Sequence, residues 1–362
     1  MALKYMQEYR DSDICRHLVQ QIHQISQHPI RLMEVCGTHT MAIFKSGLRT
    51  LLPETITLLS GPGCPVCVTA QDEIDAFVAL SRKKEIILTT FGDLMRVPGS
   101  GSSLQKESAM GADVRMVYST MDALTIAKEN PDRQVVFLAV GFETTAPTVA
   151  AAILMAKQMA ISNFSIYCAH KLVPPALFAL MNQKQVQIDG LLLPGHVSAI
   201  IGCDAYQSFF DCYKLPCVVG GFEASDLLQA IVMLVTQIEN RTPALENAYT
   251  RVVCRKGNPK ARTVMATVFD IIDATWRGIG PIAQSGLCLK KEFKDYDART
   301  RFNISITTTL EPAGCQCGEI LSGIKIPPQC PLFQTVCTPV NPVGPCMVSS
   351  EGTCAAYYRY HN

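Results

Sequence analysis

The sequence predicts an α/β protein with two small domains of parallel sheet flanked by helices, followed by a loop-rich C-terminal region. Short apolar strands alternate with amphipathic helices between about residues 30 and 240, a pattern that produces βαβ units and parallel sheets. The 362 residues are enough for two or three domains. From Pro312 onward, proline, glycine and cysteine replace this periodicity, so we expect something other than a large apolar core to order that region.

The composition limits the classes of partner. Hydrophobic residues make up 48% of the chain and the formal net charge is +1, which predicts a compact protein that binds neither nucleic acid nor an anionic membrane. No apolar run approaches the roughly 18 residues of a membrane helix, and the N-terminus lacks the features of a secretory signal. We therefore expect a cytoplasmic protein, in which the 16 cysteines are ligands, redox groups or core residues rather than disulfides.

The elements are predicted in four segments. Residues 1–29 hold an amphipathic helix over 3–26, which ends before Pro29 and packs on the rest. The first α/β domain, 30–125, has strands at 31–35, 56–59, 85–90 and 113–118 and helices at 41–52, 71–81 and 121–129. The second, 126–240, has strands at 134–140, 164–168, 191–193 and 217–219 and helices at 147–159, 174–181 and 224–239. The last segment, 241–362, has a helix at 264–276 and a charged, solvated stretch at 290–301.

Six cysteines crowd the last segment among prolines that make rigid turns. Four of them, Cys330, Cys337, Cys346 and Cys354, are separated by wide gaps, whereas zinc modules use tight C-x2-4-C pairs. The spacing favours a [4Fe-4S] cluster, with Cys315 and Cys317 as alternative ligands. The alternative is a group of buried free cysteines.

Two further cysteine motifs follow the first two strands of the first domain. Cys64 and Cys67 form a C-x-x-C pair between a strand and a helix, where thiolates are stabilised as nucleophiles and metal ligands. Cys36 ends the preceding strand, and His39 opens the next helix. The three thiols and the imidazole are expected at one sheet edge, where they could hold Fe(II). By itself, the C-x-x-C pair is also consistent with a redox pair, half of a metal site or two inert thiols.

The second domain has two comparable strand-to-helix turns. Glu143 lies in GFETTAP after the strand at 134–140, and His196 lies in PGHVS after the strand at 191–193. We expect both to face the cysteine edge across the interdomain cleft. The alternative is structural, with Thr144 or Thr145 capping a helix and His196 stabilising a turn. The chain lacks the G-x-S-x-G and phosphate-loop motifs, which argues against a hydrolase or an NTPase.

Taken together, five strings resemble the motifs of the HypD family of hydrogenase maturation factors. They are MEVCGTHT (33–40), GPGCPVCVT (61–69), GFETTAPT (141–148), PGHVSAIIG (194–202) and NPVGPCMVSSEGTCAAYY (341–358), and they occur in the family's order over nearly the whole chain. The resemblance implies a role in building the Fe(CN)2CO group of [NiFe] hydrogenases. The chain would hold iron while cyanide and CO are attached, acting as an assembly factor rather than a conventional turnover enzyme.

The resemblance also implies partners and residue roles. The partners are a HypC-type small chaperone, a HypE-type cyanide donor and, indirectly, the hydrogenase large subunit. Cys36, Cys64 and Cys67 become the iron and redox thiols, with His39 as their support. Cys330, Cys337, Cys346 and Cys354 become the [4Fe-4S] ligands, and Glu143 and His196 become cleft residues.

Two other functions fit part of this pattern. An iron–sulfur thiol–disulfide reductase explains the C-x-x-C pair and the cluster, but gives Cys36, His39 and Glu143 no task. A zinc-stabilised binding scaffold explains only the clustered cysteines. Infrared bands of CN and CO are expected for the Fe(CN)2CO assembly factor and for neither of these alternatives. Metal analysis that finds zinc and no sulfide would identify the binding scaffold.

Overall fold

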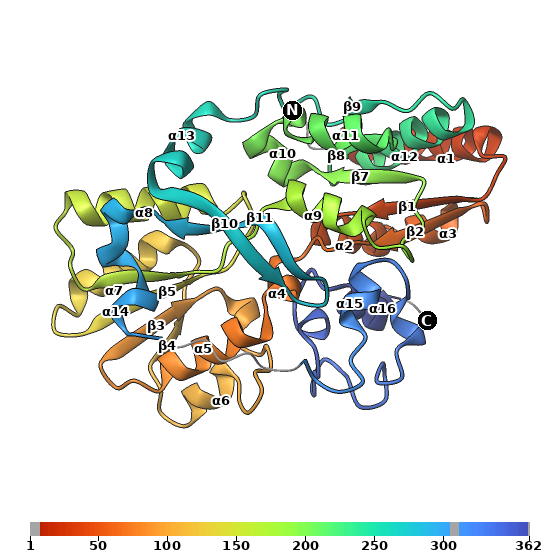
Figure 1. The fold of residues 1–362 in the computed structure, drawn as a ribbon. Helices are drawn as coiled ribbons and strands as arrows, with labels where there is room; N and C mark the ends of the chain where they lie inside the picture. The colour runs from red at the N-terminus through yellow and green to blue at the C-terminus, as the bar shows by residue number, and fades with distance from the viewer. Residues whose placement is uncertain (1–7, 305–310, 361–362) are drawn as a thin grey trace.

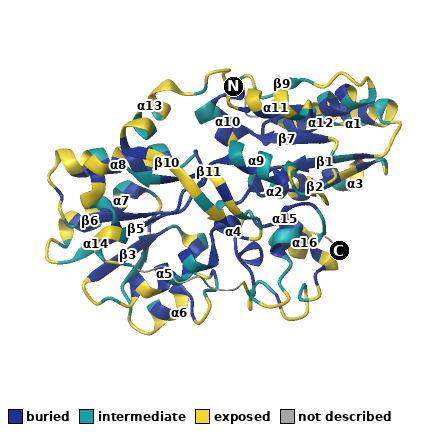
Figure 2. Cartoon of the chain, viewed as in Figure 1, coloured by how far each residue is buried: buried dark blue, intermediate teal, exposed yellow. Residues whose placement is uncertain are grey.

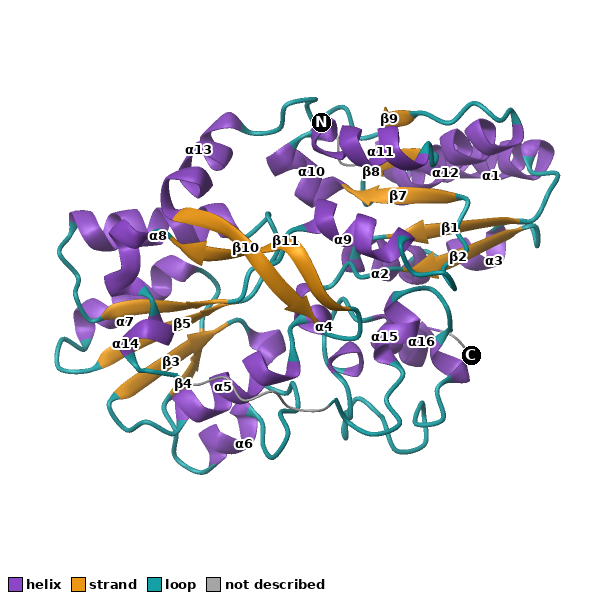
Figure 3. Cartoon of the chain, in the orientation of Figure 1, coloured by secondary structure: helices purple, strands orange, loops and turns teal. Residues whose placement is uncertain are grey.

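A computed structural model describes residues 8–304 and 311–360 of the chain. It contains two parallel sheets flanked by helices, a two-stranded ribbon across the middle, and a loop-rich C-terminal region that carries cysteines (Figures 1 and 3). The predicted fold class is therefore confirmed. The predicted N-terminal helix is present as α1 (Ser12–Ile25), and its expected first residues, 3–7, lie outside the described part.

The first sheet has five strands in the order β2-β1-β7-β8-β9, all parallel. The strands are β1 (Ile30–Glu34), β2 (Ile56–Ser60), β7 (Gly190–Pro194), β8 (Cys217–Gly220) and β9 (Leu245–Asn247). Its helices are α1, α2 (Gly37–Lys45), α3 (Leu48–Leu51), α9 (Val173–Met181), α10 (Gly195–Ile201), α11 (Gln207–Tyr213) and α12 (Ala224–Glu239). One apolar core lies between the sheet and helices α1, α2 and α12, because strand side chains alternate between the two faces.

The second sheet has four parallel strands in the order β4-β3-β5-β6. The strands are β3 (Ile86–Thr90), β4 (Val114–Met116), β5 (Gln134–Ala139) and β6 (Phe164–Cys168). Its helices are α5 (Gln71–Ser81), α6 (Leu104–Ala109), α7 (Thr120–Glu129) and α8 (Ala146–Gln158). Helices α7 and α8 cover one face, and α5 covers the other.

The sheets do not follow the predicted domain boundary near residue 125. Strands β1 and β2 pair with β7 and β8, whereas β3 and β4 pair with β5 and β6. Each predicted block therefore gives two strands to each sheet. The expectation that 30–125 and 126–240 each form their own sheet is wrong, because strand neighbours are chosen by packing between segments that are distant in the chain.

The predicted helix over 264–276 is also wrong in its second half. Helix α13 (Pro259–Val268) ends there, and β10 (Phe269–Trp276) pairs antiparallel with β11 (Gly280–Leu289). Residues 269–276 are rich in β-branched and aromatic side chains, which suit a strand. The ribbon joins the two halves of the molecule, since Trp276 bridges to Thr69 and Gly286 bridges to Lys171.

The C-terminal region packs beside the short helix α4 (Pro65–Val68) and helix α2 (Figure 1). Its helices are α15 (Cys317–Leu321) and α16 (Thr353–Tyr360), and the chain also has short 3₁₀ helices at Glu8–Arg10, Gly92–Leu94, Cys203–Tyr206, Lys291–Tyr296, Pro327–Gln329 and Pro345–Met347. The largest apolar core runs from both sheets into this region and includes the C-x-x-C pair and five cysteines near the C-terminus. Figure 2 shows this central zone as buried. Among the helices of the described residues, none combines the length and apolarity needed to cross a bilayer.

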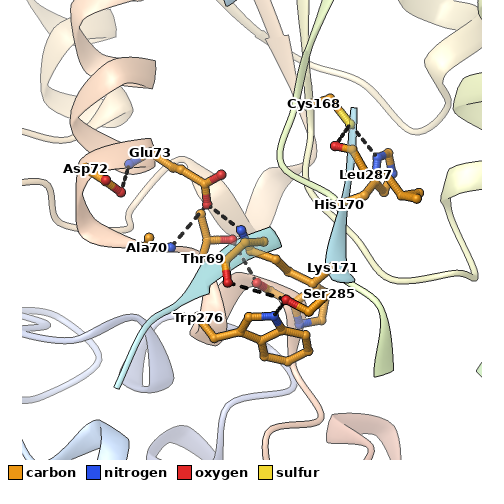
Figure 4. Close-up of polar contacts among 12 residues, drawn as sticks. Thr69, Ala70, Asp72, Glu73, Cys168, His170, Lys171, Trp276, Ser285 and Leu287 are labelled. Atoms are coloured by element: carbon orange, nitrogen blue, oxygen red, sulfur yellow. Dashed lines mark hydrogen bonds and ion pairs between the residues drawn. The ribbon is translucent and has the colours of Figure 1, made fainter. Parts of the chain in front are cut away.

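A buried ion-pair cluster holds helix α5 in place, just after the C-x-x-C pair (Figure 4). Glu73 Oε2 lies 2.9 Å from Lys171 Nζ, and Glu73 Oε1 lies 3.0 Å from an Arg299 nitrogen. Arg299 belongs to α14 (Ala298–Arg301), inside the stretch predicted to be a solvated face. Most charges of that stretch are exposed, but Arg299 turns inward, because Glu73 offers it a buried partner.

We expect Glu73→Gln to lower the free energy of unfolding by about 3–5 kcal/mol, because the buried Lys171 ammonium then lacks its carboxylate. The measurement is urea unfolding followed by circular dichroism. Asp211→Asn, which breaks the exposed pair with Lys214, is the control and should leave the unfolding midpoint close to the wild-type value. Equal midpoints for both variants would contradict the anchoring role of Glu73.

Candidate functional site

Cys36 and the C-x-x-C pair lie together at the carboxyl edge of the first sheet. Cys36 follows β1 and Cys64 follows β2, and these two strands are direct neighbours. The loop that precedes Cys64 lies against the backbone of Cys36: a Cβ at Gly63 would stand 2.2 Å from the Cys36 nitrogen. Only glycine permits this approach, so the loop sequence itself brings the three cysteines together.

The pKa values of the two thiols in the C-x-x-C pair are shifted in opposite directions. The Cys64 and Cys67 sulfurs are 2.6 Å apart, close enough to form a disulfide. Burial raises the pKa of the Cys67 thiol, but hydrogen bonds from Cys346 and Cys64 and the positive charge of Arg277 outweigh burial and lower it. Burial and the neighbouring Cys67 raise the pKa of Cys64. Cys67 is therefore the thiolate of the pair, and Cys64 retains its proton.

Cys36 is a buried, protonated thiol. Burial, followed by the negative charge of Glu351, raises the pKa of Cys36 to about 12. Glu351 accepts a hydrogen bond from the Thr38 hydroxyl and lies in the C-terminal region. A bound metal ion competes with this proton, because thiolates and not thiols are metal ligands.

The polar residues that surround these thiols were not predicted individually. The Ser349 hydroxyl lies 3.2 Å from Cys64 Sγ and donates to Asp93 Oδ2 at 3.0 Å, and Glu351 follows two residues later. Ser349 and Glu351 lie in the string at 341–358, in which the sequence assigned roles only to the cysteines. A serine and a carboxylate in a Pro/Gly/Cys-rich segment are the signals that could have identified them.

His39 is neutral and buried beside this edge. Burial lowers its pKa to about 4. Nε2 lies 3.2 Å from the Gly220 carbonyl, so this nitrogen carries the proton, and Nδ1 has no hydrogen-bond partner in the described part of the chain. His196 follows β7, is exposed, and stacks on Phe222 with ring centroids 3.8 Å apart, while His39 lies on Phe222 at 4.8 Å. The two histidines therefore share one aromatic support at the same sheet edge.

Glu143 follows strand β5 of the second sheet, whereas Cys36 and Cys64 follow strands of the first. It lines a cavity of about 660 Å³ together with Leu172, Arg262, Phe269 and other residues, none of them a cysteine. Glu143 Oε1 accepts a hydrogen bond from the Val173 amide at 3.0 Å, and Oε2 has no partner among residues 8–304 and 311–360. The structure thus places His196, but not Glu143, on the sheet edge that carries Cys36.

The six cysteines near the C-terminus line one small cavity. They are Cys315, Cys317, Cys330, Cys337, Cys346 and Cys354. The sulfurs of Cys317 and Cys346 are 2.6 Å apart, and the Cys346 thiol also contacts those of Cys354 and Cys67. Cys346 therefore connects this cavity to the C-x-x-C pair, a contact that sequence analysis missed because the two motifs are almost 280 residues apart. In the described ranges, no three His, Cys, Asp or Glu side chains are already arranged around a single metal ion.

The burial of Glu143 predicts a pH-dependent stability. Burial raises its pKa from 4.5 to about 7, so its contribution to stability is complete below about pH 4.5 and is lost as the pH rises through about 7. Over this window, the wild-type free energy of unfolding should fall by about 3 kcal/mol more than that of Glu143→Gln. Urea unfolding at a series of pH values tests this, with the exposed Glu85→Gln as a control that should follow the wild type. Parallel profiles for wild type and Glu143→Gln would refute it.

Comparison with known proteins gives one consistent result. Residues 13–361 match the HypD family model, described as the "Hydrogenase formation hypA family". The chain is 46% identical to the hydrogenase maturation factor HypD2 of Bradyrhizobium diazoefficiens, over 99% of this chain and 97% of that protein. It is 46% identical to HypD of Rhizobium leguminosarum bv. viciae, over 99% and 96%, and 45% identical to HypD of Escherichia coli, over 99% and 98% of the two chains. The chain belongs to the HypD family of hydrogenase maturation factors.

Proposed function

We propose that this hydrogenase maturation factor holds Fe(II) while cyanide and CO are attached to it, and so assembles the Fe(CN)2CO group of [NiFe] hydrogenases. The observation that carries the proposal is the meeting of Cys36, Cys64 and Cys67 at one buried sheet edge beside a neutral histidine. Thiolates donate electron density to Fe(II), which favours π-acceptor ligands such as cyanide and CO. Burial keeps water away from such a complex.

The residues of the cysteine cavity fit a [4Fe-4S] cluster in number and chemistry. A cluster needs four thiolates bound to different irons, and six thiols line this cavity. Cys317 and Cys346 are too close to each other to bind different irons in this arrangement. They therefore cannot both be ligands, which is consistent with the set that the sequence favours, Cys330, Cys337, Cys346 and Cys354. If Cys346 instead remains paired with Cys317 as a dithiol, Cys315 is the fourth ligand in its place. When bound, such a cluster supplies electrons one at a time.

The chain's own thiols can carry the reductive part of cyanide transfer. A thiocyanate on the donor becomes a thiol and HCN when two cysteine thiols give up two protons and two electrons and become a disulfide. Cys64 and Cys67 are adjacent and hold one proton and one thiolate, so the second proton comes from solvent or the donor. In the assignment that leaves Cys346 outside the cluster, its contact with Cys67 and its pairing with Cys317 place a second dithiol where it can reduce that disulfide by exchange.

The partners follow from this chemistry. A HypC-type small chaperone and a HypE-type cyanide donor are the proteins that we propose bind near the sheet edge, with the hydrogenase large subunit as the final recipient. We place the protein in the cytoplasm, where its free thiols remain reduced.

We expect Cys36→Ala and Cys64→Ala to abolish hydrogenase maturation and to remove the CN and CO infrared bands of protein isolated without oxygen. Each change deletes a sulfur that we assign to iron. Cys212→Ala, at an exposed cysteine, is the control and should retain both the bands and maturation. A fully active Cys36→Ala protein would refute the iron-holding role. A wild-type protein that contains iron and sulfide but shows no CN or CO infrared bands would instead favour the thiol–disulfide reductase. A wild-type protein that contains zinc and no sulfide would favour the binding scaffold.

The two cluster assignments make different predictions. We expect Cys337→Ser to lose most of the acid-labile sulfide and the brown colour after anaerobic reconstitution, because Cys337 is a ligand in both assignments. Cys346→Ser should retain them if Cys315 is the fourth ligand. Iron and sulfide analysis of the Cys315→Ser and Cys346→Ser proteins decides between the two. A Cys337→Ser protein with a full complement of iron and sulfide would exclude both.

A further inference from the structure

Arg277 is a fully buried guanidinium without a partner. Its exposed fraction is 2%, and none of its three side-chain nitrogens has a hydrogen-bond partner among the described residues, 8–304 and 311–360. Other inward-facing arginines are paired, Arg299 with Glu73 and Arg251 with Asp226. Burying an unpaired charge costs several kcal/mol, so such a group indicates an anion that the protein binds.

The backbone around Arg277 is wedged between the two cysteine groups. Arg277 follows β10, and its amide donates to the Val68 carbonyl of helix α4 at 2.8 Å. On the other side, a Cβ at Gly278 would stand 2.3 Å from the Gly318 backbone, next to Cys317. Figure 1 shows the end of the β10–β11 ribbon between α4 and α15.

The charge of Arg277 acts on both cysteine groups. Its guanidinium lies within electrostatic range of Cys67 in the C-x-x-C pair and of Cys315 in the cysteine cavity. The Glu311 carboxylate lies at this turn, but it accepts a hydrogen bond from the Gly278 amide and not from the guanidinium. In a buried site of low dielectric constant, one cation has a strong effect on charges nearby.

We propose that Arg277 is the counter-cation of the iron–sulfur cluster, donating N–H hydrogen bonds to its thiolate and sulfide edge on the side facing Cys67. This inference rests on the proposed function, because it requires the cluster. Arg277 is a positioning residue: it stabilises the negative charge that arrives with each electron and thereby raises the reduction potential of the cluster. The hairpin that joins the two sheets thus also sets the redox properties of the C-terminal region.

The test uses the full chain reconstituted anaerobically with Fe(II) and sulfide, as wild type, R277Q, R277K and R299Q. The reduction potential is measured by titration followed by electron paramagnetic resonance. R277Q should be at least tenfold harder to reduce, a decrease of about 59 mV for one electron. R277K, which keeps the charge, should lie between R277Q and wild type. R299Q removes a partly buried guanidinium that faces Glu73, and its potential should match the wild type.

Folding and loading are measured on the same samples. An R277Q protein that folds, by circular dichroism, but takes up less iron and sulfide than R277K and R299Q also supports the proposal. R277K keeps the charge at position 277, and R299Q loses one positive charge at a different position. An unchanged potential in loaded R277Q overturns this proposal alone. If R277Q loses thiocyanate binding without a change in reduction potential, this proposal is also overturned, because Arg277 would then bind a small anion instead of the cluster. A wild type that binds no iron and sulfide overturns the proposed function as well.

Discussion

The close approach of the 61–64 loop to Cys36 is the constraint on which the site depends. With no side chain at Gly63, the backbone of this loop lies on the backbone of Cys36, and the C-x-x-C pair is carried to the same sheet edge. The contact also buries the thiols. Burial keeps Cys36 and Cys64 protonated, while hydrogen bonds and a nearby cation make Cys67 a thiolate. Burial, together with contacts from Arg277 and the C-terminal region, therefore determines the proton distribution among the cysteines.

The site lies in the largest apolar core of the molecule rather than in an open cleft. Side chains from both parallel sheets, from the C-x-x-C helix and from the C-terminal region share this core. Thiols are compatible with such a setting because a protonated cysteine behaves as a small hydrophobic residue. A soft metal bound there would be held by sulfur and shielded from water, as an oxygen-sensitive iron complex requires.

Several buried polar side chains have atoms without a hydrogen-bond partner in the described part of the chain. They include His39 Nδ1, Glu143 Oε2 and the whole guanidinium of Arg277. Buried polar groups in proteins are normally hydrogen-bonded, so such exceptions are expected where ligands bind or chemistry occurs. The paired cluster of Glu73, Lys171 and Arg299 shows the opposite case: its charges satisfy one another and hold helix α5 against the second sheet. The contrast is between a charge cluster that organises the fold and buried polar groups that the described residues leave unpaired.

The sequence by itself determined the strand–helix rhythm, the position of each motif at a strand end and the crowding of cysteines near the C-terminus, because these depend on local periodicity and spacing. Only the tertiary structure decided that β1 pairs with β7 rather than sharing a sheet with β3, that residues 269–276 form a strand, and that Cys346 meets Cys67. It alone placed Glu143 in a separate cavity and left Arg277 unpaired. These features arise from contacts between segments far apart in the chain, whose partners are selected by packing over the whole molecule and leave no local pattern in the sequence.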